Sequence, residues 1–371
     1  MNNTSSYNKV QEPLKPRSSV ELITLSLSLA LIIALSVFGN LLLILSIFKN
    51  ERLRASFANK LILSLAIADF LTASFPMSYQ LATVVNVNII SNGGVVCTIG
   101  GLATYSFFFT STFTMIMLCI DRFVALGYPL HYNLRITSRV KIFMIAYPWV
   151  HGSLFAILCG SLLDINFDPK GLDCGLGWHK RPMAFTLSVL MIHVGMPFVL
   201  LLVLNTRTLF LVRAQNRQIL HYDKKGMTDK SGVINIRAKD AYRKRAKIEF
   251  KLAKVSITIV FVFLVCWTPY VVTRSLVFMG LKLSTGILSA GAWVVHASSF
   301  ANPLIYSSLR VDLRQAMRNV FLRHKVRQSN ASVIELENFT AKRAGEQLSA
   351  SFDSAHKRSP HATKLMLGLD N

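Results

Sequence analysis

Long apolar segments alternate with short polar segments along most of the chain. A helix needs about 20 apolar residues to cross a bilayer, and seven of the apolar segments reach that length. We predict spans at about 20–48, 58–84, 95–122, 140–163, 183–212, 250–279 and 285–308. The expected fold class is therefore an all-α membrane protein, a seven-transmembrane helix bundle.

The third span has a polar seam on one side. No charged residue occurs between 99 and 120. The residues of the seam follow spacings of four and three, which place them on one helical face: Thr104, Phe108, Ser111, Met115, Leu118 and Arg122. Small polar residues on such a face pack against other helices rather than lipid. We expect this span to lie at the centre of the bundle.

Basic residues are concentrated in alternate loops. They are frequent in 49–60, 135–141, 213–249 and 310–327, whereas 86–94 contains none. The positive-inside rule places such loops in the cytoplasm. We therefore expect a multi-pass plasma-membrane protein with an extracellular N-terminus and a cytoplasmic C-terminus. The formal net charge of +23 is thus attributed to membrane-facing loops rather than to nucleic-acid binding.

The segments outside the spans are expected to differ in order. We divide the chain into a disordered extracellular N-terminus (1–19), the transmembrane domain (20–310), an amphipathic juxtamembrane helix on the membrane surface (311–324) and a disordered cytoplasmic tail (325–371). Asn2 and Asn3 begin overlapping glycosylation sequons. Serines of the tail are candidate kinase targets for arrestin recruitment.

One acid lies inside the second span. A carboxylate near mid-membrane costs about 2.5–3.5 kcal/mol on insertion scales, so Asp69 should face a polar interior. Ser111, Ser299 and Asn302 offer oxygen atoms at a similar depth. Together these residues are predicted to hold a sodium ion as an allosteric ligand, and no other cofactor is expected. The alternative is a protonated, hydrogen-bonded structural acid.

Short motifs occur on successive spans. They are Gly39-Asn40, Leu65-Ala66-Ile67-Ala68-Asp69, Cys97, Asp121-Arg122-Phe123, Tyr128-Pro129-Leu130, Trp149, Pro197, Cys266-Trp267-Thr268-Pro269 and Asn302-Pro303-x-x-Tyr306. In this order, over about residues 20–325, the chain resembles the rhodopsin-like (class A) G-protein-coupled receptors. The resemblance implies a receptor, not an enzyme, that activates a heterotrimeric G protein. It does not indicate a ligand subfamily.

The resemblance also implies roles for single residues. Cys97 would form a disulfide with Cys174 in the second outer loop. Arg122 would pair with Asp121 and Glu249 at rest and meet the G protein once released. The residues implied in switching and G-protein coupling are Asp121, Arg122, Leu130, Glu249, Phe263, Trp267, Pro269, Asn302, Pro303 and Tyr306.

A ligand cavity is expected between the outer ends of the spans. Its predicted lining is Gln80, Thr104, Tyr105, Phe108, His193, Trp267, Tyr270, Arg274, Trp293 and His296. Amine receptors of the family have an aspartate where Thr104 stands, and opsins have a lysine where His296 stands. An amine thus has no obvious counter-ion, and covalent retinal is not indicated. A small molecule, a lipid, a short peptide and high basal activity all remain open.

Two features of this cavity have alternative interpretations. His193 and His296 form either a pH-sensitive or metal-binding pair or two neutral hydrogen-bonding side chains. Arg274 receives either an anionic ligand group or an acid of the second outer loop.

Two functions compete with the receptor interpretation. One is a seven-span ion channel or transporter, with Asp69 and the histidines along an ion path; the lack of an internal repeat disfavours it. The other is a non-signalling partner of another receptor.

Overall fold

The computed structural model describes residues 17–85, 94–168, 172–176, 182–225 and 236–322. Residues 1–317 belong to one compact unit and residues 318–371 to a second. The helix bundle and every site discussed below lie in the first unit.

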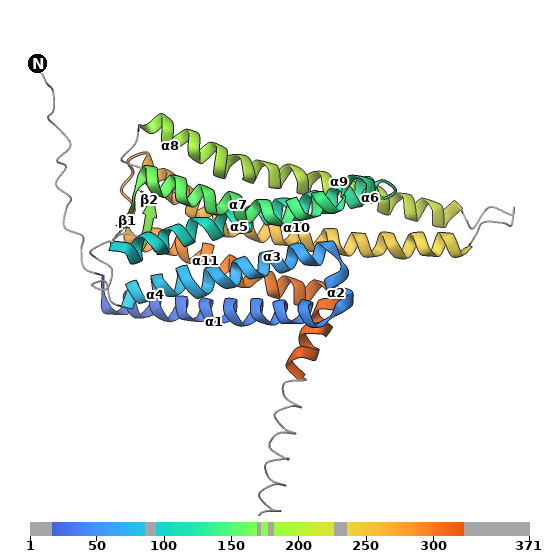
Figure 1. The fold of residues 1–371 in the computed structure, drawn as a ribbon, viewed down its shortest axis with the longest axis horizontal. Coiled ribbons are helices and arrows are strands. Elements are labelled where there is room, and N and C mark those ends of the chain that lie inside the picture. The colour runs from blue at the N-terminus through green and yellow to red at the C-terminus, as the bar shows by residue number, and fades with distance from the viewer. Residues whose placement is uncertain (1–16, 86–93, 169–171, 177–181, 226–235, 323–371) are drawn as a thin grey trace, which may run out of the picture. The chain divides into compact units, whose positions relative to one another are not determined.

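The bundle consists of long helices that run side by side (Figure 1). In chain order the helices are α1 (Ser19–Lys49), α2 (Glu51–Ala55), α3 (Phe57–Thr72), η1 (Ala73–Met77), α4 (Ser78–Val85), α5 (Gly94–Gly127), α6 (Tyr132–Arg135), α7 (Ser138–Leu163), α8 (Met183–Leu190), η4 (Met191–Gly195), α9 (Met196–Lys225), α10 (Ile236–Phe278) and α11 (Thr285–Leu309). A further helix covers 311–322. The strands β1 (Ile165–Asp168) and β2 (Asp173–Leu176) form an antiparallel hairpin.

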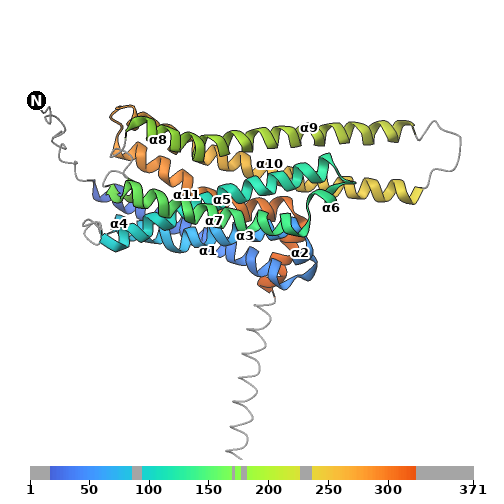
Figure 2. The same ribbon diagram turned by 45° about the horizontal axis from the view of Figure 1, so that its top comes forward.

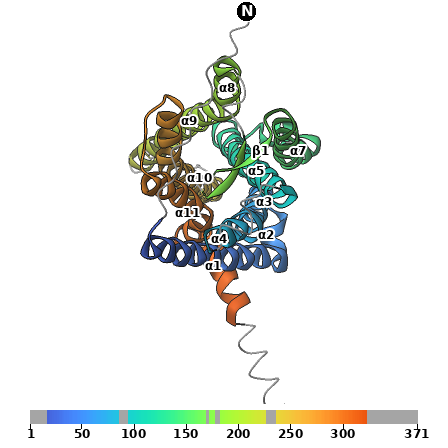
Figure 3. The same cartoon turned by 90° about the vertical axis from the view of Figure 1, so that its left-hand side faces the viewer.

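Six helical segments of the described chain are long and apolar enough to cross a membrane. The seventh long helix, α11, falls outside this group and carries His296, Ser299 and Asn302 within its length. It packs against α1 and α10, and Figure 3 shows it end-on among the other helices. Burial between neighbours, rather than uniform apolarity, therefore keeps α11 in the bundle.

Helix α5 is the central element. It packs against α3, α7, α9 and α10. Its side chains Phe109, Met115 and Ile116 are each 2% exposed. The prediction that the third span occupies the centre is therefore confirmed.

Helices α9 and α10 are longer than the predicted spans. They lie side by side and extend beyond the other helices at the end opposite the hairpin (Figure 2). The extensions carry part of the basic segment 213–249.

Two helices widen into π-helical turns near prolines. Pro76 lies inside η1, and Pro197 follows η4 by two residues. A proline donates no backbone hydrogen bond and crowds the preceding turn, and a π-turn relieves this by shifting the bonding pattern by one residue. The second turn contains His193, whose direction consequently differs from that in an unbroken α-helix.

Gly152 sets the closest approach of α7 to α5. A Cβ atom at this position would lie 2.4 Å from the backbone oxygen of Ser106 and 2.7 Å from Oγ1 of Thr110. We expect Gly152→Ala to lower the free energy of unfolding by about 1–3 kcal/mol, because the helices must separate. Thermal unfolding of the purified protein in detergent measures this, with Gly286→Ala as control because a Cβ there meets no atom within 4 Å. Equal melting temperatures for the two variants would contradict the close contact.

Candidate functional site

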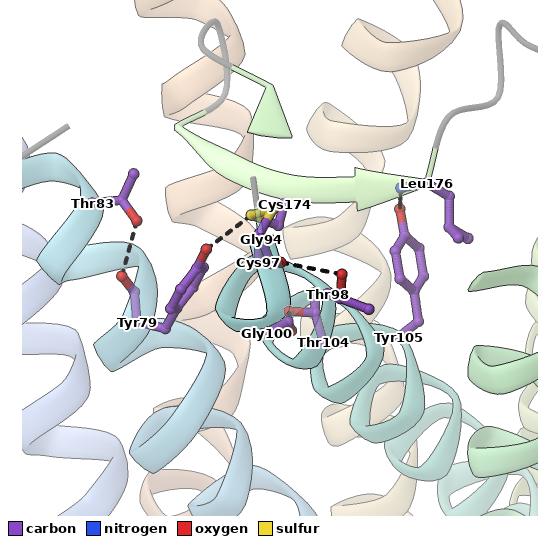
Figure 4. Close-up of a disulfide and its surroundings, with 10 residues drawn as sticks. All are labelled: Tyr79, Thr83, Gly94, Cys97, Thr98, Gly100, Thr104, Tyr105, Cys174 and Leu176. Atoms are coloured by element: carbon purple, nitrogen blue, oxygen red, sulfur yellow. Dashed lines mark hydrogen bonds between the residues drawn. A yellow bond between two sulfur atoms is a disulfide. The ribbon is translucent and has the colours of Figure 1, made fainter. Parts of the chain in front are cut away.

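A disulfide fastens the hairpin to the bundle. Cys97, in the first turn of α5, is bonded to Cys174 of β2, and their Cα atoms are 5.5 Å apart (Figure 4). The two residues are 0% and 6% exposed. The disulfide implied by the family resemblance is therefore present, and it holds β1 and β2 across one end of α5, here called the hairpin end.

Two tyrosines support the same strand. The hydroxyl of Tyr105 accepts a hydrogen bond from the backbone N–H of Leu176 at 3.3 Å. The hydroxyl of Tyr79 lies 2.9 Å from Sγ of Cys174 (Figure 4). A Cβ atom on Gly101 would lie 3.0 Å from the backbone oxygen of Cys174, which shows how closely β2 approaches α5.

Stacked aromatic rings lie deeper in the bundle, beneath the hairpin. The ring of Phe108 stacks on Trp267 with centroids 4.1 Å apart. Phe263 and Tyr270 are 5.6 and 5.9 Å from the same indole. Thr104 lies one turn nearer the hairpin on the face of Phe108, and it is exposed. Thr104 is therefore not covered by neighbouring side chains.

Arg274 links α10 to the hairpin. Its guanidinium is 2.9 Å from a carboxylate oxygen of Asp168 and 3.6 Å from one of Asp173. Asp168 and Asp173 are partners in the β-ladder, so the hairpin register brings both carboxylates to one guanidinium. The carbon at the centre of that guanidinium lies 5.3 Å from the ring centroid of Tyr270. In the structure, the partners of Arg274 are thus the loop acids Asp168 and Asp173.

Asp173 should make stability depend on pH. Burial raises the pKa of Asp173 to about 6, and the charge of Arg274 opposes this shift. A folded-state pKa above the unfolded value of 3.8 contributes stability below about pH 4 that is lost as pH rises through 6. We expect the melting temperature of the wild type, minus that of Asp173→Asn, to increase from pH 7.5 to pH 5 in purified protein. A difference that stays constant with pH would contradict this.

Three of the predicted cavity residues make polar contacts within the bundle. Nε2 of His296 is 2.5 Å from Oε1 of Gln80, which is 4% exposed. The indole N–H of Trp293 donates to Oγ of Ser28 at 2.9 Å and to the backbone oxygen of Leu25. Trp293 therefore packs α11 against α1, and the same apolar cluster includes Tyr270.

His193 and His296 contact different partners in the structure. His193 lies 5.5 Å, ring centroid to centroid, from His151 of α7, and it also contacts Phe155 at 4.6 Å. His296 is bonded to Gln80 instead. His151 was not predicted as a site residue; in the sequence, only its position two residues after Trp149 distinguishes it.

A buried polar cluster surrounds Asp69 at mid-bundle. Its Oδ1 accepts a hydrogen bond from Ser111 at 3.3 Å, and its Oδ2 accepts one from Asn302 at 2.6 Å. Ser299, 6% exposed, lies one turn before Asn302, and its backbone oxygen accepts from Asn40. The carboxylate, hydroxyl and amide oxygens of these side chains are hard ligand atoms that suit an alkali or alkaline-earth cation. The described residues contain no group of three or more His, Cys, Asp or Glu side chains placed for a metal ion.

A buried ion pair closes the opposite end of α5, here called the Arg122 end. Nε of Arg122 donates to Oδ2 of Asp121 at 3.0 Å, and a second guanidinium nitrogen contacts the same oxygen. The hydroxyl of Tyr132 donates to Oδ1 of Asp121 at 2.6 Å. Arg122 and Asp121 are 5% and 0% exposed. The side chain of Glu249 lies outside the described part of the chain.

Other predicted switch residues lie near this end or along α10 and α11. Tyr306 is fully buried and lines a small pocket together with Arg122 and Leu118. Leu130 is 89% exposed. Pro303 contacts α1 closely, because a Cβ on Gly39 would lie 3.1 Å from its ring. Pro269 lies inside α10 between Trp267 and Tyr270.

Comparison with known proteins reveals a family match that covers most of the bundle. Residues 39–306 match the family described as 7 transmembrane receptor (rhodopsin family). Trace amine-associated receptor 7b of Mus musculus is 29% identical over 82% of this chain and 83% of its own length. Octopamine receptor beta-2R of Chilo suppressalis is 27% identical over 78% of each chain. Squid rhodopsin shares the fold with a TM-score of 0.72 and 22% identity, over 85% of this chain and 91% of its own.

Proposed function

The chain belongs to the rhodopsin family of seven-transmembrane, G-protein-coupled receptors, and we propose that it receives a ligand at the hairpin end and activates a G protein at the Arg122 end. It is a multi-pass membrane receptor and not an enzyme. The observation that carries the proposal is that one helix, α5, bears both Phe108 against Trp267 and the Arg122–Asp121 pair.

The proposed signal passes from the aromatic stack to α10. A ligand above Phe108 displaces Trp267, and Phe263, 5.6 Å from the indole, transmits the change along α10. Pro269 weakens the backbone bonding of α10 next to Trp267, so it serves as the hinge. The end of α10 near Arg122 then swings outward, Arg122 leaves Asp121, and a segment of the G protein enters the pocket lined by Arg122 and Tyr306.

The proposed orientation follows from charge. The basic segments 49–60, 135–141 and 213–249 lie in connections at the Arg122 end, which places that end in the cytoplasm. The hairpin end is then extracellular, where a disulfide persists. The sequons at Asn2 and Asn3 lie outside the described residues and would share that side. In helix 311–322, Leu313 and Met317 are buried while Val311 is exposed, as expected for a helix on the membrane surface.

Further partners follow the same division. Receptor kinases and arrestin would act on the tail 325–371, which lies outside the described residues. Two relatives are named for trace amines and octopamine. An amine ligand needs a negatively charged partner, however, and Thr104 of α5 supplies none.

Sodium is proposed as an allosteric ligand at Asp69, with Ser111, Ser299 and Asn302 completing the site. We expect sodium chloride to raise the melting temperature of the purified receptor relative to potassium chloride. A concentration tenfold above the dissociation constant stabilises by about 1.4 kcal/mol. Asp69→Asn should abolish the difference and Ser111→Ala should reduce it. A sodium effect that survives in Asp69→Asn would place the ion elsewhere.

Nucleotide exchange tests the proposed function directly. The receptor is reconstituted in nanodiscs with purified heterotrimeric G proteins of the principal classes, and binding of a non-hydrolysable GTP analogue is followed with and without candidate ligands. We expect exchange above the rate of empty nanodiscs with at least one G-protein class, at baseline or with ligand. Exchange rates equal to those of empty nanodiscs with every G-protein class would contradict the proposal, provided that thermal unfolding shows the receptor to be folded.

A further inference from the structure

The guanidinium of Arg274 fills a site made of an acid and an aromatic face. It contacts the carboxylate of Asp173 at 3.6 Å and lies 5.3 Å from the Tyr270 ring centroid. Carboxylates combined with tyrosine rings recognise organic cations, because the ring face and the anion attract the same charge. Arg274 therefore occupies a cation site as part of the receptor itself.

The acid of this site is held in place, whereas its cation sits on a long side chain. Leu172, directly before Asp173, is 3% exposed and packs in an apolar cluster that includes Met77 and Trp293. Cys174, directly after it, is bonded to Cys97. Arg274 reaches the site through a flexible side chain that is 28% exposed. Replacing the cation requires only rotation of that side chain, while moving the acid requires the hairpin to detach.

One face of α10 connects this site to the aromatic stack. Trp267, Tyr270 and Arg274 follow each other at spacings of three and four residues, on one face of α10. Seven residues of helix rise about 10 Å, a length that one aromatic ring with a short charged arm fills. Thr104 of α5 lies one turn nearer the hairpin than Phe108, and its side chain is exposed.

The half-buried acid Asp173 favours a cation over an anion as the exchanging ligand group. An anion bound to Arg274 would have to separate the guanidinium from Asp168 and Asp173 and leave Asp173 partly buried without its partner. The side chains of Arg274 and Asp173 are 28% and 30% exposed, so an unpaired Asp173 would be only partly solvated, which is unfavourable for a charge. A cation in place of the guanidinium keeps Asp173 paired, and Arg274 retains Asp168, whose side chain is 33% exposed.

We propose that the ligand is a small aromatic cation whose charged group replaces the guanidinium of Arg274 between Asp173 and Tyr270, while its ring rests above the Phe108–Trp267 stack. Asp173 then supplies the counter-ion that Thr104 does not. The inference rests on the proposed function, since it names the ligand class of the same receptor site. It also gives Arg274 a second role, as a tethered competitor of the ligand.

The test measures binding in the absence of any G protein. Full-length receptor in nanodiscs at pH 7.4 is titrated calorimetrically with 2-phenylethylamine, with the neutral analogue 2-phenylethanol and with the anionic analogue phenylacetate. We expect binding of the amine only. Asp173→Asn should weaken it at least tenfold, Asp173→Glu should retain it, and Arg274→Gln should leave it equal or several-fold tighter. Asp164→Asn, which removes one negative charge from the same loop, should have no effect.

Several outcomes would overturn the inference. They are binding of phenylacetate that Arg274→Gln abolishes, absence of amine binding to the wild type, and equal amine binding by Asp173→Asn and Asp164→Asn. Disulfide formation and the melting temperature show whether Asp173→Asn is folded; if it is not, Asp173→Glu and Arg274→Gln decide the result. Amine binding without any nucleotide exchange would contradict the proposed signalling and leave this inference standing, whereas exchange without amine binding would do the reverse.

Discussion

Arg122→Ala is expected to reduce G-protein nucleotide exchange to the rate of empty nanodiscs, both at baseline and with ligand. Arg122 lines the pocket that the G protein is proposed to enter. Arg310 lines it too, but its guanidinium is bonded to Asn59 and Asp312. Its removal also leaves Asp121, which is 0% exposed, without its ion-pair partner, a loss of about 3–5 kcal/mol in buried pairs. The measurement is nucleotide exchange at matched amounts of folded receptor, quantified by thermal unfolding.

A nearby arginine provides the control for this variant. Arg135 lies at the same end of the bundle, 3.7 Å above the ring of Tyr128, and does not line the pocket. Arg135→Ala should keep most of the exchange activity. Asp121→Asn should raise the basal rate instead, because Arg122 and Tyr132 both lose the carboxylate that holds them. Normal exchange by Arg122→Ala would contradict the role proposed for Arg122.

Loss of the disulfide is expected to be the most damaging change at the hairpin end. Cys97 and Cys174 are 77 residues apart, and a loop of that size corresponds to roughly 4–5 kcal/mol in the chain-entropy model. We expect Cys97→Ala and Cys174→Ala to lower surface expression severely and to lower the melting temperature of the protein that is recovered.

The design of this experiment separates the crosslink from the loss of a buried thiol. Cys159→Ala removes a cysteine that is buried in α7 and free, and it should cost only the packing of one side chain. The double variant Cys97→Ala/Cys174→Ala should be no less stable than either single variant, since both remove the same bond. Additive losses would show that the two cysteines contribute separately.

The sequence predicted the helices better than it predicted their contacts. Apolar length determined the spans because the bilayer imposes it, so α1 and α7 begin and end close to the predicted residues. The disulfide was predicted from the family resemblance, which implied Cys97 and Cys174 as partners. The extensions of α9 and α10 have polar sequences, and their ends were therefore beyond a prediction from hydropathy.

The contacts of the predicted cavity residues could not be derived from the sequence, because the rotation of each helix decides which way a side chain points. Trp293 faces α1 and His193 faces α7, and a π-turn redirects the second of these. The partners of Arg274 depended on the register of β1 against β2, which spacing alone does not specify. Side-chain partners across elements were thus the part that required the structure.

The position of Asp173 directly beside Cys174 has a consequence for how the receptor is made. A chain synthesised in a reducing cytosol would carry all of its apolar helices and could insert them into lipid. Without the crosslink, however, nothing covalent would hold the carboxylate over the binding space. Production hosts with an oxidising secretory route should therefore yield molecules that bind ligand. Protein from bacterial inclusion bodies should be helical but should not bind ligand until the disulfide has been formed by re-oxidation.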